Sequence, residues 1–123
     1  MLLQTARRLI NIDINEILYF KSDGHYVSCC TTGSERSECL RIGIGAVEEQ
    51  LKNSRFFRVH SRYLVNLCMI AELRGLTLIL RNGAEIRMSR YRVKAVKEWL
   101  INYHLGQNTS IHDKGLDIFS GGG

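Results

Sequence analysis

A stretch in the middle of the chain interleaves cationic and apolar residues more than a simple core strand requires. It runs from Arg55 to Asn66. Alternate side chains of an extended segment point to opposite faces. The two expected faces are Phe57, Val59 and Ser61 on one side, and Arg58, His60 and Arg62 on the other. Because a guanidinium fork binds two phosphate oxygens at once, the second face is either a phosphate-binding surface or the solvated side of a half-buried strand.

Positive charge is concentrated in the second half of the chain. The 123 residues carry a net charge of +5. Residues 54–104 hold ten Lys or Arg and three acids, a net +7, so the remainder sums to −2. This distribution favours an acidic partner, which means nucleic acid, an anionic membrane surface or an acidic protein. Solvated arginines on ordinary strands would give the same count.

Length and patterning predict one domain. We expect residues 1–8 to be the remnant of a linker, residues 9–104 to form the domain, and residues 105–123 to be a flexible tail rich in Gly, Ser, Asn and Asp. The N-terminus lacks the pattern of a signal peptide, and no apolar run approaches membrane-spanning length. These features predict a cytoplasmic protein without a membrane partner.

The sequence offers little support for catalysis, a metal or a cofactor. Four cysteines are present, and none has a partner at C-x-x-C spacing: Cys29, Cys30, Cys39 and Cys68. The Gly43-Ile44-Gly45 segment is too short for a nucleotide-binding fingerprint. A dyad of Cys68 with a histidine has no local signal. We therefore expect a non-enzymatic domain without metal or cofactor.

Turn signals and periodicity predict short strands and two helices. Strands are expected on either side of a connection at residues 22–25, and Asn82-Gly83 is the strongest hairpin signal. Residues 43–53 have helical periodicity, with Glu48 expected to face outward. A last helix is expected after an N-cap at Ser89, ending near Gly106.

The expected first turn of the last helix is unusual in its charge. It carries Arg90 and Arg92 on either side of Tyr91. A helix N-terminus favours negative charge, so two arginines there oppose local stability. A bound phosphate would compensate this, whereas on a solvated turn the effect would be negligible.

The combination of motifs resembles the LytTR DNA-binding domain, the output module of many bacterial response regulators. The resemblance covers about residues 9–103 and rests on residues 17–20 and 24–27, the run from Phe56 to Asn66, residues 78–80, Asn82-Gly83, and residues 86–91. The order Ser61-Arg62 departs from the family, in which Arg-Ser is frequent. The resemblance implies a mainly β (α+β) fold with short antiparallel sheets and two small helices.

It also implies that three loops, rather than a recognition helix, enter successive major grooves of DNA. The residues implicated in DNA binding are His25, Tyr26, Arg58, His60, Ser61, Arg62, Arg90, Tyr91, Arg92 and Lys94. Arg62 and Arg90 suit guanine edges, the commonest specific contact. Phosphate contacts are expected from Arg58, Ser61, Arg92 and Lys94.

Other roles remain open for several of these side chains. His60 could hydrogen-bond within its own loop, and Asn66 is expected to cap a turn rather than touch DNA. His25 could be a loop residue without a ligand. Tyr91 could pack on sugar or a thymine methyl, or close the core.

The resemblance implies a sequence-specific, double-stranded DNA-binding transcriptional regulator of two-component type. Two copies would bind paired half-sites, and a receiver domain or sensor kinase would lie outside this chain. One alternative is an RNA-binding module that uses Tyr26, Phe57 and Tyr63 as stacking platforms. The other is a basic protein-interaction domain that docks an acidic protein.

Overall fold

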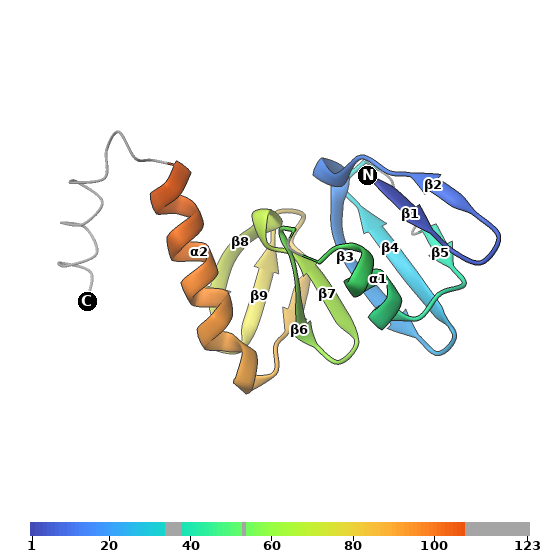
Figure 1. Cartoon of the computed structure of the whole chain (residues 1–123). Helices are drawn as coiled ribbons and strands as arrows, with labels where there is room; N and C mark the ends of the chain where they lie inside the picture. The colour runs from blue at the N-terminus through green and yellow to red at the C-terminus, as the bar shows by residue number, and fades with distance from the viewer. Residues whose placement is uncertain (34–37, 53, 108–123) are drawn as a thin grey trace, which may run out of the picture.

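The computed structural model describes residues 1–33, 38–52 and 54–107, with the backbone alone described for residues 104–107. Residues 34–37, 53 and 108–123, which include most of the predicted tail, lie outside these ranges. The described chain forms three antiparallel sheets and two α-helices (Figure 1). This is the mainly β fold with two helices that the sequence predicts.

The elements follow the chain in short pieces. The strands are β1 (Leu2–Gln4), β2 (Leu9–Asn11), β3 (Ile17–Asp23), β4 (Tyr26–Thr31), β5 (Glu38–Leu40), β6 (Phe56–His60), β7 (Tyr63–Asn66), β8 (Ile70–Arg74), β9 (Thr77–Leu80) and β10 (Glu85–Arg87). The helices are α1 (Ile44–Gln50) and α2 (Val93–Gln107), with 3-10 turns η1 (Ile14–Glu16), η2 (Leu67–Met69) and η3 (Arg90–Arg92).

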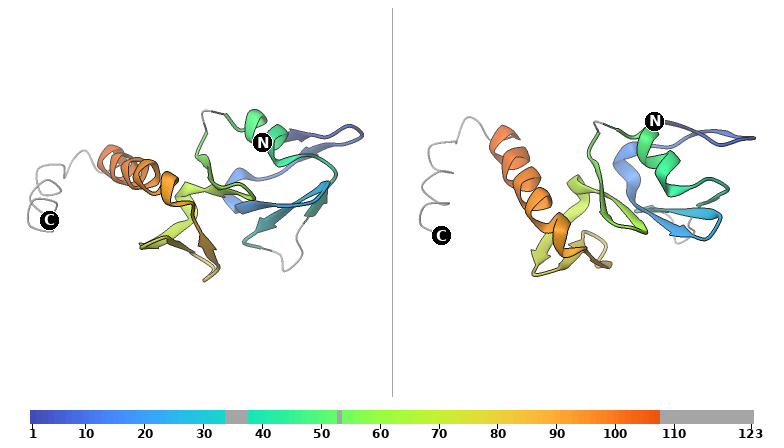
Figure 2. Two further views of the ribbon diagram at one scale, coloured as in Figure 1. Left: turned by 90° about the horizontal axis from the view of Figure 1, so that it is seen from below. Right: turned by 60° about the horizontal axis from the view of Figure 1, so that its bottom comes forward.

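A five-stranded sheet in the order β5-β4-β3-β7-β6 lies at the centre, and both of its faces are covered. Leu64 and Val65 are neighbours on β7 and therefore point to opposite faces. Leu64 packs in one core with residues of β1 and α1, and Val65 packs in a second core with residues of β9, β10 and α2. The views in Figure 2 show α1 and the β1–β2 hairpin at one end and α2 at the other.

The first residues of the chain take part in the fold, whereas the sequence predicts the remnant of a linker over residues 1–8. β1 pairs with β2, and Leu3 is fully buried in the first core. The side chain of Gln50 on α1 donates to the Gln4 carbonyl at 2.8 Å and accepts from the Gln4 amide at 2.9 Å. A three-residue strand is too short to show a period in the sequence, so only tertiary packing reveals it.

Most of the turns predicted from the sequence are present, with boundaries that differ by a few residues. The connection between β3 and β4 is reduced to Gly24 and His25, and Gly24 has a positive φ of 66°. Asn66 caps η2, because its side chain accepts from the Cys68 amide at 3.0 Å, as predicted. Because residues 67–69 form this capped turn, strand β8 begins only at Ile70.

The predicted last helix is divided into two parts. Ser89 caps η3 by accepting from the Tyr91 amide at 3.4 Å, and α2 begins only at Val93. The arginines expected in the first α-helical turn therefore lie on a 3-10 turn that leads directly into the helix. No helix in the described part of the chain is long and apolar enough to span a bilayer.

Candidate nucleic-acid interface

Two β-turns lie side by side at one end of the central sheet. β3 and β7 are antiparallel, with Lys21 opposite Tyr63. The Ser22 amide donates to the Arg62 carbonyl at 2.8 Å, one step beyond that pair. The turn that follows β3, at Gly24 and His25, therefore reaches the same edge as the turn that precedes β7.

Residues 89–92, the third of the loops that the family resemblance implies, join this edge from the sheet of β8, β9 and β10. The Ser89 amide donates to the Val59 carbonyl at 2.9 Å, which attaches the start of η3 to the end of β6. Figure 1 shows η3, the β6–β7 turn and the β3–β4 turn one after another along the lower edge of the molecule. We call this edge, comprising residues 24–26, 60–62 and 89–92, the rim.

Five of the predicted site residues line one hollow between the second and third segments. The lining residues are Glu48, Arg58, His60, Ser61, Ser89, Tyr91 and Arg92. Glu48 comes from α1 and the others come from the ends of β6 and η3. The hollow is thus formed by segments that are far apart in sequence.

The β6–β7 turn is braced from within by Arg58. Its guanidinium donates to the Ser61 carbonyl through Nε at 3.2 Å and through Nη2 at 2.5 Å. Its Nη1 forms an ion pair with Glu48 at 2.9 Å, and only 21% of the Arg58 side chain is exposed. Glu48 therefore faces Arg58 rather than solvent alone, contrary to the expectation for this helix. Arg58 has a structural role that the sequence did not predict.

His60 also holds this turn. Its Nδ1 accepts from the Arg62 amide at 3.2 Å, and its ring lies 5.9 Å from the Tyr63 ring. Of the two roles considered from the sequence, this is the loop-internal hydrogen bond. An Nδ1 that accepts must be unprotonated, so Nε2 carries the proton in this arrangement.

The arginines of the rim, and Lys94 beside it, are exposed and have no ion-pair partner among the described residues. The ion pairs among the described residues involve Arg8, Lys52, Arg58 and Arg74, so none uses the remaining predicted cations, which are Arg62, Arg90, Arg92 and Lys94. The Arg92 guanidinium lies 5.8 Å from the centre of the Phe57 ring, within the range of a cation–π contact. The rim therefore presents net positive charge to solvent.

The first segment presents polar and aromatic groups. His25 is exposed, and 46% of the Tyr26 surface is accessible. Tyr91, on the third segment, is 87% exposed and does not close the core. These side chains are available to a partner.

Comparison with known proteins assigns the chain. The family model described as the LytTr DNA-binding domain matches residues 7–101. The chain belongs to the LytTR family. A solved LytTr DNA-binding domain from Bacillus cereus has the same fold, with a TM-score of 0.63 and 18% identity, over 81% of this chain and 94% of that one.

Longer regulators contain a similar segment. The chain is 28% identical over 99 residues to the heme-containing CO-sensing transcriptional regulator RcoM 2 of Paraburkholderia xenovorans (strain LB400), covering 76% of this chain and 36% of that protein. It is 26% identical over 103 residues to the sensory transduction protein LytT of Bacillus subtilis (strain 168), covering 80% and 42%. This LytTR chain thus spans less than half of these relatives.

The aromatic residues of this LytTR domain do not form the platform that an RNA-binding module would need. Phe57 lies under Arg92, and Tyr63 packs against Tyr19 with ring centres 5.9 Å apart. Both are half-buried. Of the three aromatic residues considered from the sequence, only Tyr26 is exposed, so stacking of successive bases has little support.

The sequence did not indicate two residues that lie beside the rim of the LytTR domain, Glu48 and Lys21. Glu48 carries no local signal, because its partner Arg58 lies ten residues further along the chain. Lys21 is not among the predicted site residues. Its Nζ lies 6.0 Å from the centre of the Tyr63 ring, and its position on β3 is one register step from the rim. A period-2 reading of β3 could have placed Lys21 on the exposed side.

None of the four cysteines, all of which lie in the described part of the chain, forms a disulfide. Burial is the main cause that raises the pKa of Cys29 to about 12, so this thiol stays protonated at neutral pH. Among the described residues, no three His, Cys, Asp or Glu side chains gather as metal ligands would.

Proposed function

We propose that this LytTR domain binds double-stranded DNA in a sequence-specific manner, with the three rim segments entering the major groove. The observation that carries the proposal is the union of these segments on one edge, through the hydrogen bonds from Ser22 to Arg62 and from Ser89 to Val59. The family assignment supports DNA as the partner. A rim with uncompensated arginines suits both phosphates and guanine edges.

The role of each side chain in DNA binding follows from its exposure and from the hydrogen bonds that it already makes within the protein. Arg62 and Arg90 are exposed and carry guanidinium groups at two different segments, so we assign them to base edges. Ser61, Arg92 and Lys94 fix the register through phosphates. His25, Tyr26 and Tyr91 complete the contact surface, whereas Arg58 and His60 act by holding the β6–β7 turn.

The domain would serve as the output part of a longer regulator. Two relatives are named a CO-sensing transcriptional regulator and a sensory transduction protein, and this chain covers 36% and 42% of them. We propose transcriptional regulation as the function of the whole protein. Two copies on paired half-sites would contact a longer DNA sequence than the rim of one domain can. Sedimentation of the protein–duplex complex would test whether two copies bind.

Selection of bound sequences from a random duplex pool tests the proposal directly. Binding of the selected duplex should fall with salt at a log–log slope of about −4 to −5 for roughly five phosphate contacts. Arg62→Ala should lose about 1–3 kcal/mol of binding free energy and relax preference at one base pair.

Arg81→Ala is the matched control. Arg81 is exposed and follows β9, whose opposite end lies near the rim because Thr77 pairs with Arg87. This variant should keep both affinity and preference. Recovery of no preferred sequence, or equal binding of single-stranded RNA in competition, would contradict the proposal.

A further inference from the structure

A second cluster of arginines lies beside the rim, in the half of the chain whose net charge is negative. Arg7 and Arg8 come from the β1–β2 turn, and Arg41 follows β5. All three line one hollow, together with Thr5 and Ala6. No local pattern connects them, because more than thirty residues separate Arg8 from Arg41.

Strand register places Arg41 at the rim end of the central sheet. β4 and β5 are antiparallel, with Val27 opposite Leu40. Arg41 therefore lies one step further along, beside Tyr26 and the β3–β4 turn. Figures 1 and 2 agree that the β1–β2 and β3–β4 turns lie at the same end of the molecule. The arginine cluster thus continues the row of rim segments beyond His25.

The β1–β2 turn has a defined shape that presents its arginines. The Thr5 amide donates to the Arg8 carbonyl at 2.9 Å. The Thr5 Oγ1 accepts from the amides of Arg7 at 3.4 Å and of Arg8 at 3.1 Å. Because these bonds fix the backbone, little conformational freedom is lost when the turn meets a ligand.

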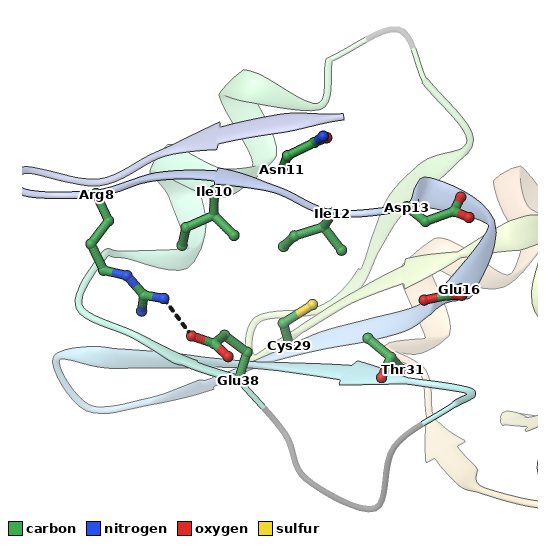
Figure 3. Close-up of a pocket in the computed structure, with 9 residues that line it drawn as sticks. All are labelled: Arg8, Ile10, Asn11, Ile12, Asp13, Glu16, Cys29, Thr31 and Glu38. Atoms are coloured by element: carbon green, nitrogen blue, oxygen red, sulfur yellow. Dashed lines mark hydrogen bonds and ion pairs between the residues drawn. The ribbon is translucent and has the colours of Figure 1, made fainter.

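Only one charge of the cluster is compensated within the described residues. Figure 3 shows the Arg8 guanidinium directed at Glu38, with Nη2 2.6 Å from Oε1. Arg7 and Arg41 are exposed, and neither takes part in an ion pair between described residues. Two guanidinium groups therefore remain for an anionic partner.

We propose that Arg7 and Arg41 bind the phosphate backbone of DNA at one end of the footprint, as a fourth contact beyond the three rim segments. This inference rests on the proposed function. A duplex lying along the rim continues past the β3–β4 turn, and its phosphates are the anions that this position would meet. Guanidinium groups suit phosphate oxygens, and such contacts fix register without reading sequence.

The double variant Arg7→Ala/Arg41→Ala tests the contact on the duplex recovered by selection. Removing two phosphate contacts should make the log–log salt slope shallower by about 1.8, at roughly 0.9 per contact, with preference between sequences unchanged. Arg7→Lys/Arg41→Lys should keep most of the slope, since it keeps the charge.

Arg55→Ala/Arg81→Ala is the control with the same change in net charge. Arg55 precedes β6, and Arg81 follows β9, at the ends of these strands away from the rim. This control should keep the wild-type slope. Thermal unfolding should show the variants of Arg7 and Arg41 folded, because both residues are exposed. The control removes two hydrogen bonds, from Arg55 to Asn15 Oδ1 and from Arg81 to the Cys68 carbonyl, so the same measurement must show it folded before its slope is compared.

Phosphate ethylation interference on the wild-type protein gives an independent readout. Ethylation at one edge of the footprint should weaken wild-type binding and have no effect on the Arg7→Ala/Arg41→Ala variant. If the wild type binds its selected duplex and the variant has the same slope and the same interference pattern, the fourth contact is overturned and the proposed function stands. If the wild type selects no duplex, both are rejected.

Discussion

The β6–β7 and β3–β4 turns reach the same edge and are held in opposite ways. In the β6–β7 turn, the Arg58 guanidinium donates to the Ser61 carbonyl and pairs with Glu48, and His60 accepts from the Arg62 amide. In the β3–β4 turn, residues 23–26 make no side-chain hydrogen bond or ion pair to any described residue. One turn is thus fixed by side chains, and the other by its hairpin backbone alone.

This difference predicts how each turn would contribute to DNA binding. A side chain on a fixed turn loses little conformational freedom on binding, so more of its contact energy appears as affinity and specificity. Ordering a side chain such as His25 on the other turn offsets part of its contact energy. We therefore expect base preference to depend more on Arg62 than on His25.

Replacing Arg58, whose guanidinium braces the β6–β7 turn, should have the largest effect on DNA affinity. Arg58→Lys keeps the positive charge, but an ammonium group cannot reach both the Ser61 carbonyl and Glu48 as the guanidinium fork does. Hydrogen bonds to charged groups contribute about 1.5–3 kcal/mol, so affinity for the selected duplex should fall about ten- to a hundred-fold.

Fluorescence anisotropy with a labelled duplex measures this change, and thermal unfolding checks that the domain stays folded. Arg58→Ala should be about as weak as Arg58→Lys. A lysine variant with wild-type affinity would mean that Arg58 acts as a charge on phosphate rather than as a brace.

Three substitutions of His60 distinguish its two nitrogens. The Asn side chain can place Oδ1 where Nδ1 accepts from Arg62, whereas Gln reaches the position of Nε2. If His60 holds the turn, His60→Asn should keep affinity, and His60→Ala and His60→Gln should lose about fivefold, or roughly 1 kcal/mol for one hydrogen bond.

The same anisotropy titration scores all three variants. The opposite order, with Gln retained and Asn lost, would show that Nε2 contacts DNA directly. In that case two side chains of the β6–β7 turn, Arg62 and His60, would contact DNA, instead of Arg62 alone.

Local chemistry accounts for the parts of the fold that the sequence predicted. Asn82-Gly83 and Gly24 marked hairpins because glycine adopts the positive φ values of 90° and 66° found there. The helical period of Ile44, Val47 and Leu51 matched three buried positions around α1. Each of these signals is contained within a few neighbouring residues.

The missed features all depend on contacts between distant segments. Leu3 is buried by a core that no short window reveals, and the Glu48–Arg58 pair joins a helix to a strand. Arg41 reaches the rim only through the register of β5 on β4. The candidate contact residues could be chosen from motifs, but their partners inside the protein required the three-dimensional arrangement.

A glycine substitution that strains the β3–β4 turn tests whether its backbone shape matters for DNA binding. Gly24→Ala places a Cβ at a φ of 66° with open space around it, so backbone strain alone should lower stability by about 1 kcal/mol. Because the shape of the β3–β4 turn depends on its backbone conformation, we also expect about a threefold loss of DNA affinity.

Gly83→Ala is the control, since Gly83 has a φ of 90° and lies in the β9–β10 turn, at the end of those strands away from the rim. Thermal unfolding should show a similar loss of stability in both variants, and anisotropy should show weaker binding for Gly24→Ala alone. Equal affinities of the two variants would mean that the shape of the β3–β4 turn does not matter for binding.

The smallest effect is expected at Glu48, and it separates charge from hydrogen bonding in the brace. Glu48→Gln keeps an oxygen that can accept from Arg58 and removes a negative charge near a positive rim. Because the Glu48 side chain is 45% exposed, solvent screens that charge, and affinity should rise by no more than about twofold at low salt.

Glu48→Ala removes the acceptor as well. It should weaken binding in the same direction as Arg58→Ala, but less. If the Gln and Ala variants weaken binding equally, the charge of Glu48, rather than its hydrogen bond, holds the turn. The larger contribution of the β6–β7 turn to DNA affinity, relative to the β3–β4 turn, should then decrease as salt is raised.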